Sequence, residues 1–188
     1  MELHRIIDSI KCLPAQQRLL IEEITEEINL PKHHKITDTG KPMPYIYFQK
    51  EGICRIFYYA GIKEVVLGFT FPGDVLLSLN YYAHGESGYE TIETLENSAL
   101  YRIPIGPLQD LFDRHTDIAN WGRKLAELEA LKIEDRLMLR LFKSAKESYQ
   151  ELLEKAPDLI LRIKLGHIAS YLGISQVTLS RIRSEKKY

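Results

Sequence analysis

The sequence predicts an α+β protein with a β-rich body, a long helix and a C-terminal helix-turn-helix. Between about residues 30 and 104, short runs of β-forming residues alternate with turn residues, which is typical of antiparallel sheets. After residue 104, apolar residues recur at spacings of three and four, which is typical of helices. We therefore expect three parts in the 188 residues: a body at 1–115, a long helix at 116–145 and a helical module at 146–188.

The body begins with a helical pattern and continues with strands. Ile6, Ile7 and Ile10 precede Pro14, and further apolar residues follow at helical spacing, so residues 1–29 are expected to be helical. Turn residues then divide the chain into expected strands at residues 45–49, 54–59, 64–71, 75–79, 89–95 and 100–103. Strands this short and this regularly interrupted indicate an antiparallel sandwich or barrel.

The second part is a long helix that follows a short one at 105–112. Near its start, four apolar residues keep a three-four-three spacing, the seam expected where two helices pack side by side: Ile118, Trp121, Leu125 and Leu128. Packing on the chain's own barrel is the alternative for part of this stripe. We predict that these residues contribute to a homodimer. Another helix is expected at 148–155, before Pro157.

The third part ends in two short helices joined by a tight turn. Ala169 is small enough to let the helices approach each other, and Gly173 supplies the backbone freedom that the turn needs. Ser175 is a good N-cap for the second helix, in which Val177 and Leu179 are among the residues expected to point inward. This pattern predicts a helix-turn-helix that presents its second helix to the DNA major groove. A purely structural hairpin with a solvated basic end is the alternative.

Composition and charge narrow the class of protein. The whole chain has a net charge of −1, whereas residues 157–188 carry six Lys and Arg against two acidic residues, which suits attraction to phosphate by that end alone. The two cysteines, Cys12 and Cys54, form no CxxC pair, which argues against structural zinc and iron–sulfur clusters. No signal-peptide pattern or membrane-length apolar run is visible, so we expect a cytoplasmic protein with reduced thiols.

The order of β-rich domain, long helix and terminal helix-turn-helix resembles the Crp/Fnr family of bacterial transcription regulators. The strongest match is residues 167–183, where parts look especially like family members from the Bacteroidetes. A second match is Phe71-Pro72-Gly73-Asp74-Val75, which looks like the family's glycine-aspartate turn. The resemblance implies a cyclic-nucleotide-binding-like jelly roll, a dimerising long helix and DNA-binding domains that reorient when an effector binds. It also implies double-stranded DNA and RNA polymerase as partners.

The resemblance also assigns roles within the second helix of the helix-turn-helix. Gln176, Val177 and Arg181 fall where the family reads base edges. Arg181 suits bidentate contact with guanine, Gln176 suits adenine or a phosphate, and Val177 suits a thymine methyl group. The candidates for contact with the DNA backbone are Ser175, Thr178, Ser180, Arg183, Lys186 and Lys187.

Two departures from the family pattern matter. Members that bind cyclic AMP carry a glutamate for the ribose and an arginine for the phosphate, but Ser78 stands at the glutamate position and residues 89–91 contain no arginine. No Lys or Arg occurs between Gly73 and Thr94, so cyclic AMP is not the expected effector. The candidate effector-pocket residues are Gly73, Asp74, Ser78, Tyr89, Glu90 and Thr91.

The second departure is at the C-terminal end. Many family members continue into a β-hairpin wing, whereas this sequence stops at Tyr188, so we expect the wing to be absent and Lys186 and Lys187 to supply some phosphate contact. His33 and His34 do not indicate a metal site, because neighbours on a strand point to opposite faces.

Three classes of function compete. The leading one is a homodimeric, sequence-specific transcription regulator whose barrel senses an unidentified small molecule or serves as a scaffold. The alternative is a ligand-binding or protein-interaction module whose helix-turn-helix has lost DNA binding. An enzyme is not expected, because the sequence shows no nucleophile–base constellation, metal motif or phosphate loop. We accordingly assign no catalytic residue, metal ligand or cofactor.

Overall fold

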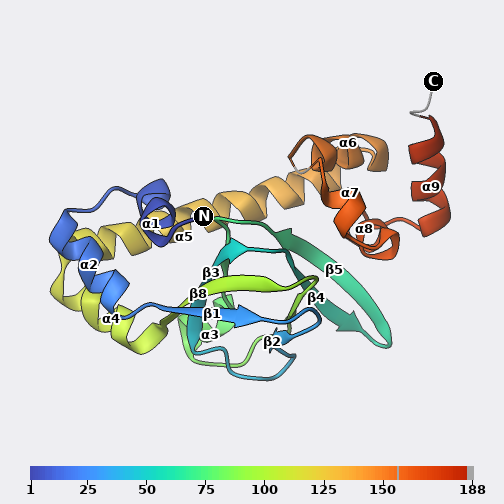
Figure 1. Ribbon diagram of the computed structural model, residues 1–188. Coiled ribbons are helices and arrows are strands. Elements are labelled where there is room, and N and C mark those ends of the chain that lie inside the picture. Colours follow the sequence, from blue (N-terminus) through green and yellow to red (C-terminus); the bar gives the residue numbers. More distant parts are fainter. Residues whose placement is uncertain (156, 186–188) are drawn as a thin grey trace.

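The computed structural model describes residues 1–155 and 157–185 (Figure 1). Its strands are β1 (Glu26–Leu30), β2 (Lys35–Thr37), β3 (Tyr45–Glu51), β4 (Cys54–Ala60), β5 (Lys63–Thr70), β6 (Val75–Leu76), β7 (Thr91–Thr94) and β8 (Ser98–Pro104). Its helices are α1 (Leu3–Ile10), α2 (Ala15–Glu23), α3 (Leu79–His84), α4 (Ile105–Arg114), α5 (Thr116–Phe142), α6 (Ala145–Lys155), α7 (Leu159–Arg162), α8 (Leu165–Tyr171) and α9 (Gln176–Ser184). None of the described helices is both long enough and apolar enough to cross a membrane.

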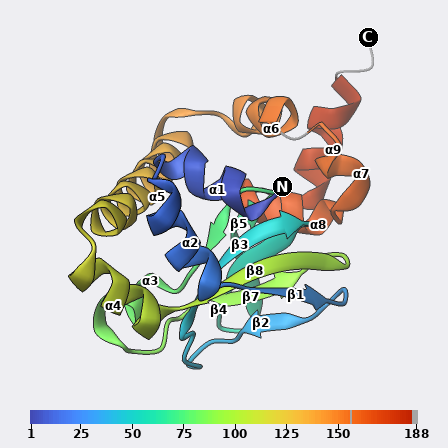
Figure 2. The same ribbon diagram turned by 60° about the vertical axis from the view of Figure 1, so that its left-hand side comes forward.

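The strands form two four-stranded antiparallel sheets, in the orders β1-β8-β3-β6 and β2-β7-β4-β5 (Figures 1 and 2). Side chains from both sheets meet in a buried cluster that includes Tyr47, Leu76, Ile92 and Leu100. Because neighbouring residues of a strand point to opposite faces, each strand contributes alternate apolar residues to this cluster. The predicted β jelly roll is confirmed.

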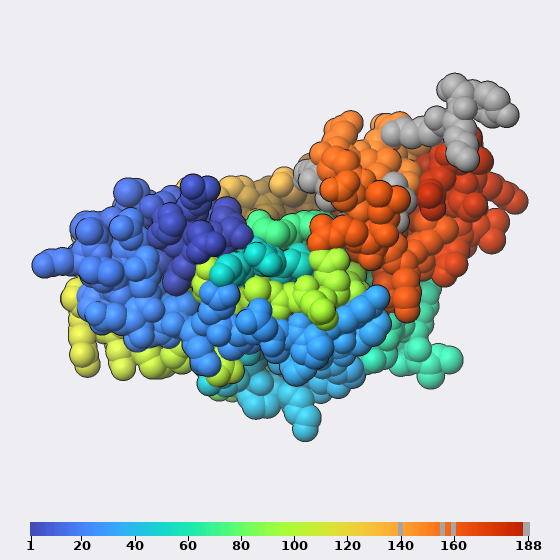
Figure 3. Space-filling view, viewed as in Figure 1, coloured from blue at the N-terminus to red at the C-terminus, as the bar shows by residue number. Residues whose placement is uncertain are grey.

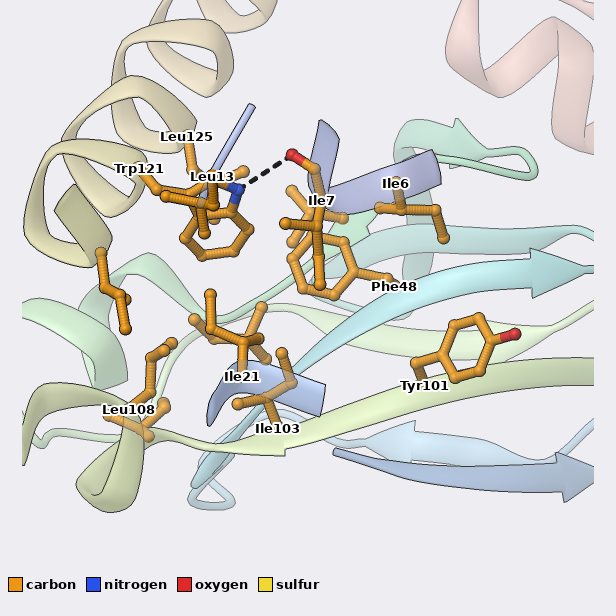
Figure 4. Packing of buried hydrophobic residues seen from close by; sticks show 14 residues of the cluster. Ile6, Ile7, Leu13, Ile21, Phe48, Tyr101, Ile103, Leu108, Trp121 and Leu125 are labelled. Carbon is orange, nitrogen blue, oxygen red and sulfur yellow. Dashed lines mark hydrogen bonds between the residues drawn. The ribbon is translucent and has the colours of Figure 1, made fainter. Parts of the chain in front are cut away.

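One end of the barrel is covered by α1, α2, α4 and the first half of α5. Trp121 of α5 is fully buried there, and its indole Nε1 donates a hydrogen bond to the carbonyl oxygen of Ile7 at 3.0 Å (Figure 4). Phe48 of β3 packs against Trp121 with ring centroids 6.2 Å apart. Aromatic burial with the polar N–H satisfied makes a stable anchor between helices and sheet.

Residues 145–155 and 157–184, here called the C-terminal module, pack on the opposite part of the barrel, near β4 and β5 (Figures 1 and 3). Ile168, Ala169 and Leu179 of the module share one buried cluster with Phe57 and Val66 of the barrel. The module therefore does not have a core of its own in this arrangement.

Several expected elements have different bounds, because sheet pairing decides what periodicity leaves open. The helix expected at 1–29 is two helices separated around Pro14, and the chain turns into β1 at Glu26 because residues 26–30 pair with β8. The strand expected at 75–79 ends at Leu76. Ser78 then caps α3 by accepting a hydrogen bond from the Tyr81 backbone N–H at 3.4 Å.

The helical half of the chain differs in smaller ways. The long helix expected at 116–145 ends at Phe142, and α6 begins at Ala145 rather than at residue 148. Strand β2 and helix α7 were not expected, because three or four residues are too few for a recognisable period.

Candidate nucleic-acid interface and effector pocket

The helix-turn-helix forms as the spacing predicts. Gly173 adopts the left-handed conformation with φ of 69°, which a glycine tolerates without strain. The Ile174 backbone N–H then donates to the Ala169 carbonyl at 3.0 Å, closing the turn. Ser175 caps α9, because its Oγ accepts from the Thr178 backbone N–H at 3.1 Å.

The outer face of α9 is open to solvent. Gln176, Thr178, Ser180, Arg181 and Arg183 are all exposed, as a surface that contacts DNA must be. Lys186 and Lys187 lie outside the described residues.

Val177 differs from one expectation, and Ser175 has a second contact besides the predicted cap. Val177 is 62% exposed, so the expectation that it points inward is wrong, and only its assignment to the DNA face is compatible with its position. Ser175 Oγ already serves the cap and also lies 2.9 Å from Thr178 Oγ1. The hydroxyl groups of Ser175 and Thr178 can therefore bind a phosphate only in competition with the contacts that they make at the start of α9.

Helix α8 is attached to the free edge of β5 by one side chain, which forms hydrogen bonds with two backbone groups of that strand. Ser170 Oγ accepts a hydrogen bond from the Val66 backbone N–H at 3.0 Å and donates one to the Glu64 carbonyl at 3.2 Å. β5 is the last strand of its sheet, and unpaired groups on an edge strand need such partners.

Arg55 of β4 organises a charged network at the same place. Its guanidinium pairs with Glu93 and Glu64, both at 2.5 Å, and contacts His167 Nδ1 of α8 at 3.2 Å. Burial, followed by the positive charge of Arg55, lowers the pKa of His167. The imidazole is therefore neutral near pH 7, and a neutral ring nitrogen can accept the hydrogen bond from Arg55.

The predicted effector residues separate into two groups. Four have structural partners. Gly73 adopts φ of 99° in its turn, Asp74 accepts from the Phe71 backbone N–H at 2.9 Å, Ser78 caps α3, and Thr91 donates to Asp38 at 2.8 Å.

Tyr89 and Glu90 are the two that line a cavity of about 350 Å³ between the barrel and α5. Four residues of α5 complete its lining: Glu129, Ile133, Arg136 and Leu137. Sequence reasoning missed these because the long helix was assigned to a separate part of the chain.

Residues 27–115 match the family model of the cyclic nucleotide-binding domain. The structure of FixK2 from Bradyrhizobium japonicum superposes with a TM-score of 0.72 at 22% identity, covering 86% of this chain and 84% of that one. A transcriptional regulator of the Crp/Fnr family from Eubacterium rectale gives a TM-score of 0.69 at 21% identity, covering 92% and 83%. The chain has the Crp/Fnr fold.

The c-di-GMP-responsive global regulator CLP from Xanthomonas campestris is a third similar structure. Its TM-score is 0.69 at 15% identity, and 92% of this chain and 91% of that one are covered. No functionally curated protein sequence matches the chain. Identities this low relate these proteins by fold.

Within the Crp/Fnr fold, the predicted dimer seam needs correction. Ile118 and Trp121 are 0% exposed and Leu125 is 8% exposed, all within the cluster that joins α5 to the chain's own α1 and β3. These three residues are not available to a second copy, so the prediction of a seam through them is wrong. Leu128, half-buried, lines a separate cavity beside α1.

Exposed apolar residues lie further along the same helix. They are Leu131, Ile133, Leu137, Met138, Leu141 and Phe142, each between 48% and 72% exposed. An apolar stretch of this kind on one helix is unusual for a surface that faces only water.

No metal site is supported by the described part of the chain. No three His, Cys, Asp or Glu side chains there are grouped so as to hold an ion. His33 lies against Glu93, with Nδ1 3.2 Å from Oε1. Cys54 is buried, which raises the pKa of its thiol to about 12.

Proposed function

We propose that this protein is a sequence-specific DNA-binding transcription regulator of the Crp/Fnr type that acts as a homodimer. The observation that carries the proposal is the capped helix α9, whose polar and cationic outer face is exposed. Such a helix fits the major groove, where guanidinium and amide groups recognise base edges. RNA polymerase is the further partner that this type of regulator implies.

The exposed apolar residues at the end of α5 support the dimer. They begin at Leu131, just beyond the part of the helix that is anchored to the barrel. A second copy that packs along this stretch would bury the residues that a monomer leaves in water. It would also fix the spacing of two α9 helices, as recognition of two half-sites requires.

The effector domain is proposed to respond to something other than cyclic AMP. Ser78 is buried and engaged in capping α3, so it does not replace the missing ribose-binding glutamate. Glu90 adds a negative charge to the wall of the cavity, which disfavours a cyclic phosphate there. Titration with cyclic AMP is expected to give no binding heat.

The decisive experiment is selection from randomised duplex DNA with the purified, ligand-free protein. We expect enrichment of an inverted repeat whose half-site centres are about one helical turn, roughly 34 Å, or a small multiple apart. Arg181→Ala should cost about 1–3 kcal/mol on the selected site and relax one base preference. Arg114→Ala, an exposed arginine on α4, is the matched control and should bind normally.

A second function is favoured by one specific observation. The C-terminal module shares its buried cluster with the barrel and is hydrogen-bonded to the β5 edge, so it can act as part of a single binding module without DNA. In that case selection would enrich no sequence, with or without a bound small molecule. Unchanged affinity of Arg181→Ala would likewise contradict base reading by that residue.

A further inference from the structure

The cavity between the barrel and α5 has mainly apolar walls. Its volume of about 350 Å³ is in the range of small-molecule sites. The aliphatic residues come from β4, β5, β6, the segment after β6, α3 and α5: Ile56, Leu67, Val75, Leu77, Leu79, Ile133 and Leu137. A ligand that fits this cavity must therefore be largely apolar, since its affinity would come mainly from removing apolar surface from water.

One buried side-chain oxygen of this lining has no hydrogen-bond partner among the described residues. Glu90 Oε1 is buried, and no hydrogen-bond donor among the described residues reaches it. A buried acceptor left unpaired is costly, more so when it is charged. Gly88 leaves the room that this carboxylate occupies, because a Cβ at that position would collide with the Glu90 oxygens. Glu90 also lines the cavity, so a ligand N–H or O–H donor that reaches its carboxylate from the cavity side would pair with this charge.

A second charged group enters the lining from α5. The Arg136 guanidinium lies against β5 at Gly68, where an added Cβ would come within 3.3 Å of the Arg136 Cζ atom. The other carboxylate of the lining, Glu129, is paired with Lys132 at 2.9 Å. A guanidinium carries only donors, and Arg136 is half-buried, so it can donate to an acceptor oxygen of a ligand that fills the cavity.

These two groups set the charge of the ligand. An anion attracted by Arg136 would also meet Glu90 and Glu129, whereas a cation attracted by Glu90 would meet Arg136. We propose that the effector is a neutral, largely apolar small molecule that donates an N–H or O–H to Glu90 and offers an oxygen acceptor to Arg136. This inference rests on the proposed sensor role of the barrel.

Three probes with one ring system test the charge requirement. Indole-3-propionamide, tryptamine and indole-3-propionate are neutral, cationic and anionic, respectively, and can be titrated by calorimetry into the full-length protein. The amide should bind most tightly, and the propionate should bind about tenfold more weakly or not at all, because it loses a donor to a charged acceptor. Cyclic AMP belongs in the same series and should not displace the amide.

Substitution of Glu90 should change the affinities of two probes in opposite directions, which misfolding would not do. Glu90→Gln should weaken the amide about tenfold and strengthen the propionate, because it removes both the charge-assisted bond and the repulsion. Arg136→Gln should weaken the amide and leave tryptamine unchanged or stronger. Glu86→Gln, an exposed glutamate of the same loop, is the matched control and should alter none of the three.

Several results would overturn the proposal. They are tightest binding by the propionate or by cyclic AMP, equal loss of all three probes in Glu90→Gln, and no heat from the amide at low-millimolar concentration. DNA selection is an independent readout. Amide binding without DNA enrichment would support the proposed ligand of the cavity and contradict the proposed DNA-binding function. DNA enrichment without amide binding would support the DNA-binding function and contradict the proposed ligand.

Discussion

The two ends of the barrel hold their helices in different ways. At one end, α5 is anchored by Trp121, which is fully buried and hydrogen-bonded to Ile7 within a continuous apolar cluster. At the other end, the C-terminal module combines a shared apolar cluster with a polar network, in which Ser170 completes an edge strand and Arg55 meets His167. The first attachment depends on burial and shape, and the second also depends on groups that water can replace.

The difference suggests a division of labour along one chain. An apolar anchor resists changes of pH and salt, whereas partly exposed polar contacts weaken with both. The stretch of α5 between the two attachments carries the exposed apolar residues. The anchored end thus keeps the helix fixed to the barrel, whereas the attachment of the module depends in part on contacts that pH and salt weaken.

The largest effect is expected at the apolar anchor. Trp121→Ala should lower the free energy of unfolding by about 3–5 kcal/mol, because it leaves a cavity and removes one of the two hydrogen bonds that the Ile7 carbonyl oxygen accepts, the other coming from the Lys11 backbone N–H. Urea denaturation followed by circular dichroism measures this change. Tryptophan fluorescence is not suitable, because Trp121 is the only tryptophan and the substitution removes it. Trp121→Phe keeps most of the ring and should cost less. A small loss for Trp121→Ala would contradict the anchor.

The next effect concerns self-association. Leu141 is 63% exposed, so Leu141→Glu should leave the free energy of unfolding of the monomer within about 0.5 kcal/mol of the parent. It should nevertheless shift the protein towards monomer in sedimentation velocity at any given concentration. Leu19→Glu, at a residue 52% exposed on α2, is the control. A parent protein that is monomeric throughout would reject the dimer.

The contrast also explains what the sequence could and could not predict. The jelly roll and the turn of the helix-turn-helix depend on local signals, such as strand breaks and the glycine at position 173. The apolar spacing from Ile118 to Leu125 was detected, but spacing alone cannot say whether a helix packs on its own barrel or on a second copy.

The polar attachment could not be predicted from spacing at all. Arg55 and His167 are 112 residues apart, and nothing in the local sequence of either indicates the other. The place of Arg136 in the cavity lining could not be predicted for the same reason. Only the path of α5 across the barrel brings this residue beside β5. Contacts between distant segments are decided by topology rather than by local pattern.

A moderate effect is expected at the edge of β5. Ser170→Ala removes the acceptor of the Val66 N–H and should weaken the attachment by about 1–3 kcal/mol. Hydrogen exchange should then become faster at the Val66 amide and unchanged at backbone amides beside Trp121. Ser9→Ala, which removes a hydroxyl bonded to the Ile6 carbonyl at the other end, should not affect Val66. Equal acceleration at both ends would mean that the two attachments open together.

The smallest effect is a dependence on pH. Burial lowers the pKa of His167, Arg55 and Lys164 lower it further, and Glu64 and Glu93 oppose them. The attached form therefore has a pKa below the ordinary value of 6.5, and the released form binds more protons in acid. The attachment is complete above pH 6.5, weakens as the pH falls below it, and stops weakening below the lowered pKa.

Protection of the Val66 amide tests this sign directly. After correction for intrinsic exchange, protection in the parent protein should be constant from about pH 8 to pH 6.5 and should fall from pH 6.5 towards about pH 5. His167→Gln cannot take up the proton, so its protection should be nearly independent of pH across that interval. The same slope in both proteins would mean that the imidazole of His167 does not cause the effect, and would contradict this prediction.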